Sequence, residues 1–142
     1  MTDVRGPLRV LVVDDSAFAR QTISGILKDI PGVEIVGKAT DGADAIPKVT
    51  RLQPDLITLD LEMPHMDGFE FLRWLMATRP TPTLVVSSVN AQADVFRALE
   101  LGALDVIRKP RRAVSPELAS IRDEIARVVA DLPSLVLQKR DG

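Results

Sequence analysis

The chain has no cysteine and only one histidine among its 142 residues, and charge of neither sign is in large excess. Without cysteine, disulfide frameworks and thiolate metal sites are excluded, which suits a reducing compartment. The 18 basic and 20 acidic residues give a formal net charge of −2. This balance provides no broad electrostatic surface for nucleic acid or for an anionic membrane, so neither is expected as a partner.

Long apolar segments are also missing. The first nine residues, MTDVRGPLR, lack the apolar core of a signal peptide, and no run approaches the ~20 apolar residues of a membrane span. A length of 142 residues fits one domain, since a domain usually has roughly 100–200 residues. The sequence therefore predicts one soluble domain with a cytoplasmic location.

Short apolar segments rich in β-branched residues alternate with helical patterns along the chain. Strands are predicted at residues 8–13, 33–36, 55–60, 83–88 and 105–109. Five helices are predicted. They cover 17–30, the stretch after 41–42 that runs to 52, the apolar stripe at 71–75 with an end at 78, about 95 to 102, and 118–132. Continuous apolar strands are typical of sheets that helices cover on both faces. The pattern predicts a doubly wound α/β fold with a five-stranded parallel sheet.

Two prolines affect the predicted helices. Pro47 lies inside the second one, so this helix is predicted to kink or to begin late enough that Pro47 falls in its first turn. Pro133 is predicted to end the last helix. Residues 133–142 then read as the start of a linker or tail, which favours a chain that is a fragment of a longer protein.

Carboxylates follow two of the predicted strands. Asp14 and Asp15 end the first strand, and Asp60 ends the third. Ligands of doubly wound sheets bind outside the carboxyl ends of the strands, so neighbouring first and third strands would gather the three carboxylates in one crevice. Close carboxylates repel one another and have raised pKa values unless a cation is bound. Magnesium is the natural cation, because it prefers oxygen ligands and often binds substrate phosphate too.

Two further strand ends carry groups suited to a phosphoryl ligand. Ser87, at the end of the fourth strand, supplies a hydroxyl, and Lys109, at the end of the fifth, supplies an ammonium. Both groups bind phosphate oxygens. Together with the three carboxylates they predict a magnesium-dependent phosphoryl site.

These residues resemble the receiver domain of two-component response regulators. The matching features are the pair Asp14-Asp15, Asp60, the turn MPHMDG at 63–68, Ser87 and the pair Lys109-Pro110. The resemblance covers residues 8–132 and implies a flavodoxin-like (CheY-like) sheet with the strand order 2-1-3-4-5. The segments LDLEMPHMDGFEFLRWLM, LVVSS and ALELGALDVIRKP are most similar to the receiver of chemotaxis protein-glutamate methylesterases.

The resemblance implies how a phosphoryl group would be taken up. Asp60 would be the nucleophile that accepts it from a phosphohistidine on a sensor histidine kinase, which the narrower resemblance suggests is a chemotaxis kinase. Asp15, Asp60 and the backbone carbonyl of Glu62 would bind Mg²⁺ directly. Asp14 would act through water or help to position the ion.

The remaining roles concern the bound phosphoryl group. Ser87 would hydrogen-bond it and Lys109 would pair with it, and the bond between Lys109 and Pro110 would be cis. Many receivers carry an aromatic residue three positions before this lysine, where the present chain has Val106. An aromatic switch at this position is therefore in doubt.

Other functions stay open from the residues alone. A magnesium phosphatase of the haloacid dehalogenase type also forms an aspartyl phosphate. Such enzymes need a second acid two residues after the nucleophile, and Glu62 lies two residues after Asp60. A receiver that stands alone or serves another output, and a structural module without magnesium affinity, are further alternatives. A dinucleotide site is disfavoured, because no G-x-G-x-x-G follows the first strand.

The narrower resemblance also predicts what the chain does not do. In methylesterases of this type the catalytic serine, histidine and aspartate lie in a domain that follows the receiver, and here there is no G-x-S-x-G motif. The chain is expected to regulate such an effector domain and to have no methylesterase activity itself.

His65 is assigned no role, Trp74 is expected to pack partly against the core, and the basic cluster at 108–112 is expected to be a solvated loop.

Overall fold

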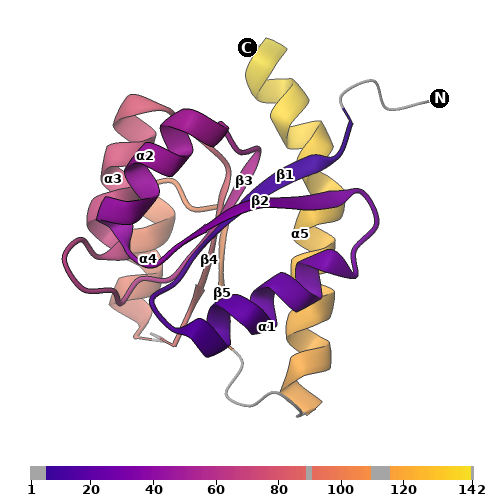
Figure 1. Ribbon diagram of the computed structural model, residues 1–142, viewed down its shortest axis with the longest axis horizontal. Helices are drawn as coiled ribbons and strands as arrows, with labels where there is room; N and C mark the ends of the chain where they lie inside the picture. Colours follow the sequence, from indigo (N-terminus) through magenta and orange to yellow (C-terminus); the bar gives the residue numbers. More distant parts are fainter. Residues whose placement is uncertain (1–5, 89–90, 110–115, 142) are drawn as a thin grey trace.

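The computed structural model describes residues 6–88, 91–109 and 116–141, and within the last helix it describes the side chains of residues 118–132. Five parallel strands form one sheet, and helices follow them in strict alternation (Figure 1). The strands are β1 (Leu8–Val13), β2 (Val33–Ala39), β3 (Leu56–Leu59), β4 (Thr83–Ser87) and β5 (Asp105–Arg108). The helices are α1 (Ala17–Lys28), α2 (Gly42–Leu52), α3 (Gly68–Thr78), α4 (Gln92–Glu100) and α5 (Pro116–Asp141).

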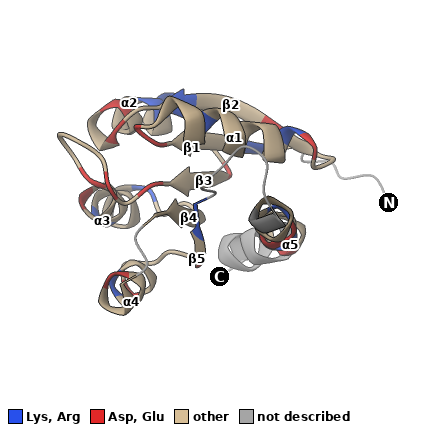
Figure 2. Ribbon diagram, turned by 90° about the horizontal axis from the view of Figure 1, so that it is seen from below, with Lys and Arg blue, Asp and Glu red and all other residues tan. Residues whose placement is uncertain are grey.

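The strand order is β2-β1-β3-β4-β5, so the doubly wound fold and the predicted order are confirmed. In Figure 2 the strands are stacked edge to edge, with α2, α3 and α4 on one side of the sheet and α5 on the other. The side chains of α1 and α5 belong to one buried layer, and those of α2, α3 and α4 belong to the other. Because β1 lies inside the sheet, its carboxyl end faces the topological switch point where ligands bind in such folds.

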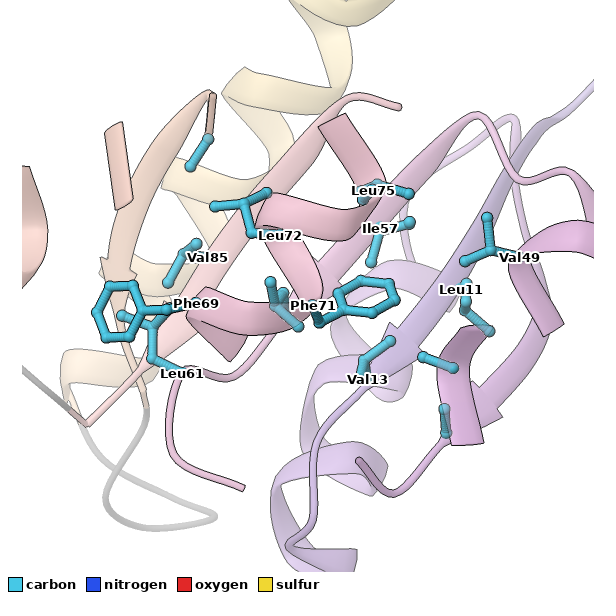
Figure 3. Packing of buried hydrophobic residues seen from close by; sticks show 14 of the residues in the cluster. Leu11, Val13, Val49, Ile57, Leu61, Phe69, Phe71, Leu72, Leu75 and Val85 are labelled. Atoms are coloured by element: carbon cyan, nitrogen blue, oxygen red, sulfur yellow. The ribbon is translucent and has the colours of Figure 1, made fainter. Parts of the chain in front are cut away.

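Alternate residues of each central strand face opposite layers, as the period of a strand requires. In β1, Val10 and Val12 pack towards α1 and α5, whereas Leu11 and Val13 pack towards α2 and α3. Figure 3 shows the second layer, in which Phe71 of α3 lies between the helices and the sheet. Phe71 is fully buried, and a truncation to alanine at such a site costs about 3–5 kcal/mol.

Several predicted boundaries are confirmed closely, whereas the late start of the second helix, one of the two alternatives given for Pro47, and the end of the last helix at Pro133 are wrong. Ser16 caps α1 through its side chain, which accepts a hydrogen bond from the N–H of Ala19 at 3.2 Å. α2 begins at Gly42 after its cap Asp41, so Pro47 lies in the helix interior and not in the first turn. The cap at Asp41 stabilises a helix that begins at Gly42, and the single backbone N–H that Pro47 lacks does not move this start.

The last helix also differs from the prediction, because α5 continues past Pro133 to Asp141. A proline removes one helical hydrogen bond, and the residues that follow it here include leucine, glutamine, lysine and arginine, which all favour helix. The division into a receiver at 8–132 and a tail at 133–142 stays a prediction. None of the helices in the described part of the chain is long and apolar enough to cross a bilayer.

Candidate functional site

The carboxyl ends of the inner strands bring the predicted site residues together. Val13 of β1 is paired with Leu59 of β3, so the next residues, Asp14 and Asp60, lie side by side. The N–H of Asp60 donates to the carbonyl of Val13 at 3.0 Å. On the other side, the N–H of Lys109 donates to the carbonyl of Ser87 at 2.9 Å. Residues from four segments of the chain therefore meet at the carboxyl edge of the sheet.

Three carboxylates form the centre of this site. Asp14, Asp15 and Asp60 each offer one oxygen, and these oxygens lie within 4.8 Å of one another. Asp14 is fully buried and Asp60 is 2% exposed, whereas Asp15 is exposed. A set of carboxylate oxygens open to solvent on one side fits a hard divalent cation such as Mg²⁺, which usually keeps several waters.

Burial makes two of these carboxylates hard to ionise. It raises the pKa of Asp60 to about 6, and the neighbouring charge of Asp14 adds to the increase, while Lys109 opposes it. Burial also raises the pKa of Asp14, although the N–H of Ser16 and the ammonium of Lys109 both stabilise its charged form. Near neutral pH Asp60 is still mainly ionised, so it can act as a nucleophile.

Lys109 supplies the positive charge between the two buried carboxylates. Its Nζ lies 3.0 Å from Oδ2 and 3.1 Å from Oδ1 of Asp14, and 3.3 Å from Oδ2 of Asp60. Burial alone would lower the pKa of this ammonium, but its contacts with Asp14 and Asp60 raise the pKa overall. The predicted role of Lys109 concerned the phosphoryl group alone, and sequence reasoning missed its position as a counter-ion of the carboxylates.

Ser87 and Glu62 lie next to the same carboxylate. The fully buried hydroxyl of Ser87 donates to Oδ1 of Asp60 at 3.2 Å, and the N–H of Glu62 donates to that oxygen at 3.4 Å. The side chain of Glu62 is exposed, and its Oε1 accepts a hydrogen bond from the hydroxyl of Ser88 at 3.4 Å. A contact of the Glu62 carbonyl with a metal ion stays a prediction.

The turn after Asp60 depends on one glycine. A Cβ on Gly68 would lie 2.3 Å from the carbonyl oxygen of Asp60 and 2.6 Å from Cα of Leu61. The N–H of Gly68 donates to the carbonyl of Leu61 at 3.0 Å, and Asp67 caps α3 by accepting from the N–H of Glu70. The glycine in the MPHMDG turn thus lets this turn fold back tightly against the end of β3.

His65 lies in this turn but contacts a different element. Its Nδ1 is 3.0 Å from Oδ2 of Asp41, the residue that caps α2, and its side chain is 76% exposed. Hydrogen bonds from the N–H of Asp44 and from His65 lower the pKa of Asp41. The sequence assigned His65 no role, and the structure shows that it ties the turn to α2.

Other predicted features have more limited outcomes. The ring centroids of Trp74 and Phe71 are 5.9 Å apart, and half-buried Trp74 packs against the core, so the packing prediction is confirmed. Val106 is half-buried against the same layer. The cis bond predicted before Pro110, and most of the basic cluster at 108–112, lie outside the described residues.

Comparison with known proteins identifies the family. Residues 10–116 match the response regulator receiver domain. Protein-glutamate methylesterase/protein-glutamine glutaminase 3 of Geobacter sulfurreducens is 51% identical over 122 residues, which make up 86% of this chain and 33% of that protein. Protein-glutamate methylesterase/protein-glutamine glutaminase 1 of Myxococcus xanthus is 48% identical over 121 residues, which make up 85% of this chain and 35% of that protein. The chain thus spans about a third of the length of these relatives.

Solved structures lead to the same family. The response regulator domain of Thermotoga maritima CheB has a TM-score of 0.80 at 38% identity, and the match covers 89% of this chain and 96% of that one. CheY of Borrelia burgdorferi, in a CheX-CheY-BeF3-Mg+2 complex, has a TM-score of 0.75 at 29% identity, with 87% of this chain and 90% of that one covered. The predicted resemblance is confirmed: the chain belongs to the response regulator receiver domain family and is homologous to the receiver part of chemotaxis methylesterases.

Proposed function

We propose that Asp60 accepts a phosphoryl group from a phosphohistidine of a sensor histidine kinase, and that the kinase belongs to a chemotaxis pathway. One observation carries this proposal. Asp60 is almost fully buried, accepts hydrogen bonds from Ser87 and Lys109, and lies within reach of the oxygens of Asp14 and Asp15. A nucleophile, a hydroxyl, an ammonium and a cation site are the components that phosphoryl transfer needs.

In the proposed transfer, a carboxylate oxygen of Asp60 attacks phosphorus and forms the aspartyl phosphate. The phosphorus–nitrogen bond breaks, and its electron pair returns to the imidazole of the kinase histidine. Lys109 and Ser87 contact the attacking carboxylate, which supports the proposal that they neutralise and hydrogen-bond the arriving phosphoryl oxygens. The nearby negative charge of Asp14 would oppose the approach of phosphate unless cations neutralise it.

A magnesium ion is part of the proposal. Asp15, Asp60 and the Glu62 carbonyl would hold it directly, with Asp14 acting through water or positioning the ion. When bound, the ion would offset the charge of the carboxylates and of the phosphoryl group. The support is the oxygen-only cluster of this chain and the Borrelia burgdorferi CheY structure, whose title names BeF3 and Mg+2.

The proposed output is a methylesterase domain that the receiver regulates in a longer protein. The relatives named protein-glutamate methylesterase/protein-glutamine glutaminase are about three times as long as the part that this chain matches. This chain itself is proposed to have no methylesterase activity, and neither nucleic acid nor membrane is proposed as a partner. The predicted cytoplasmic location is part of the same proposal.

The deciding experiment is incubation with Mg²⁺ and acetyl phosphate, followed by intact mass. We expect a gain of one phosphoryl group in the unaltered chain and in the control Asp55→Asn, and none in Asp60→Asn. Asp55 is a suitable control, because it lies at the opposite end of β3. Rapid catalytic release of phosphate from small esters would favour the haloacid dehalogenase alternative, and failure to bind magnesium would favour a structural module.

A further inference from the structure

Arg20 makes a contact beside the three carboxylates, and the proposed chemistry does not use this contact. It is the fourth residue of α1, and its Nη1 donates to the backbone carbonyl of Asp14 at 2.7 Å. Helical side chains lean towards the N-terminus of their helix, so Arg20 reaches back over the turn that carries the two adjacent carboxylates.

This contact provides a partner for a main-chain group of a fully buried residue. The N–H of Asp14 donates to the carbonyl of Ala39, and Oδ1 of Asp14 accepts from the N–H of Ser16 at 2.8 Å. The backbone carbonyl of Asp14 is the remaining main-chain group, and Arg20 supplies a donor to it. Since Asp14 is 0% exposed, water cannot replace that donor without a local opening of the turn.

The carbonyl of Asp14 belongs to the peptide unit that leads into Asp15. This unit is planar, so the direction of its carbonyl also determines where the N and Cα atoms of Asp15 lie. Asp15 is exposed, and burial does not fix its side chain as it does that of Asp14. The position of the Asp15 carboxylate relative to Asp60 therefore depends on how firmly the preceding peptide is held.

We propose that Arg20 is a positioning residue for the divalent cation site, which it serves by fixing the Asp14–Asp15 peptide through the carbonyl of Asp14. This inference rests on the magnesium site of the proposed function. This positioning role differs from an effect of charge alone. By its charge, a guanidinium close to the carboxylates should oppose the binding of a cation.

The two roles predict changes of opposite sign in Arg20→Met. If Arg20 positions the peptide, its removal weakens Mg²⁺ binding about tenfold, since groups that orient metal ligands typically contribute 10- to 100-fold to affinity. If Arg20 acts by charge alone, its removal strengthens Mg²⁺ binding. Arg20→Lys keeps the charge but replaces the planar guanidinium, so we expect weakening intermediate between the unaltered chain and Arg20→Met.

The test is calorimetric titration with MgCl₂ of the full chain, of both Arg20 variants and of the control Arg51→Met. Arg51 is exposed in the last turn of α2, and its replacement removes the same charge without touching the acidic turn. We expect unchanged affinity in the control and weakened affinity in Arg20→Met, with the thermal midpoint recorded for each chain without magnesium.

Three results would overturn the role of Arg20. Tighter binding by Arg20→Met would show a charge effect, and a lower thermal midpoint with unchanged Mg²⁺ affinity would show a purely structural contact. If the unaltered chain binds no Mg²⁺, the proposed metal site itself fails and this role fails with it. The first two results leave the proposed function intact.

Discussion

The two ends of β1 and β3 use the same kinds of charged residue in opposite ways. At the amino ends, the N–H of Arg9 donates to Oδ2 of Asp55 at 3.0 Å, and the guanidinium of Arg9 donates to the carbonyl of Gln53 at the end of α2. At the carboxyl ends, Asp14 and Asp60 are buried around the ammonium of Lys109. The first arrangement completes backbone hydrogen bonds, whereas the second keeps charge away from water.

This difference shows where the molecule gives up stability for function. Arg9 and Asp55 are partly solvated, and they satisfy groups that the end of a helix and the start of a strand leave unpaired. The burial of Asp60 raises its pKa to about 6, which means that its ionised form is disfavoured in the folded state. The contacts at the amino end stabilise the fold, and in the proposed function the carboxyl end would gain stability from a bound cation or phosphoryl group.

The largest effect is expected from Asp60→Asn. The change is nearly isosteric, so the fold should survive, but the nucleophilic carboxylate is lost and phosphorylation by acetyl phosphate should fall to background. Intact mass measures the product. At the other end of the same strand, Asp55→Asn should keep full phosphorylation. A phosphorylated Asp60→Asn variant would contradict the assignment of the nucleophile.

The second-largest effect is expected in the pH dependence of stability, which the carboxyl ends of the strands should control. The folded-state pKa of Asp60 is raised from 3.8 to about 6, so the protonated form favours folding, and this stability is present below pH 4 and is lost as pH rises through 6. Asp60→Asn should therefore gain stability relative to the unaltered chain between pH 4 and 7, by roughly 3 kcal/mol at most. Urea unfolding without divalent ions at pH 4.5 and 7.5 measures the change. A constant difference between the two chains would argue against a raised pKa.

A third prediction concerns the competition between Lys109 and a metal ion. The ammonium occupies the space between Asp14 and Asp60, so Lys109→Met should strengthen Mg²⁺ binding on the order of tenfold while it slows phosphorylation. Calorimetric titration gives the affinity, and the rate of mass gain with acetyl phosphate gives the second quantity. Loss of magnesium binding in this variant would show that the lysine organises the carboxylates instead of competing for them.

The smallest effect is expected at the amino end. Arg9→Met keeps much of the apolar stem but removes the donor to the carbonyl of Gln53, and should lower the free energy of unfolding by about 1 kcal/mol. Magnesium affinity and phosphorylation should not change, because Arg9 lies at the opposite ends of the strands. A changed magnesium affinity would mean that the two ends are coupled through the sheet.

The alternation of strands and helices could be predicted from the sequence alone, and so could the residues that end the inner strands. These are local properties: apolar runs, caps such as Ser16, and carboxylates placed directly after a strand show their pattern within a few residues. The resemblance to receivers also depended on short motifs of this kind. The end of α5 was predicted wrongly, because the local signal of Pro133 was outweighed by the helix-forming residues around it.

The contacts among the site residues follow from the tertiary fold and could not be predicted from the sequence. Lys109 and Asp14 are 95 positions apart in the chain, and the contact between them follows from the order of strands in the sheet. The raised pKa of Asp60 and the hold of Arg20 on the Asp14 carbonyl likewise arise from burial and from the packing of α1 beside β1. Distances and desolvation depend on what surrounds a residue in space, and no local pattern contains that information.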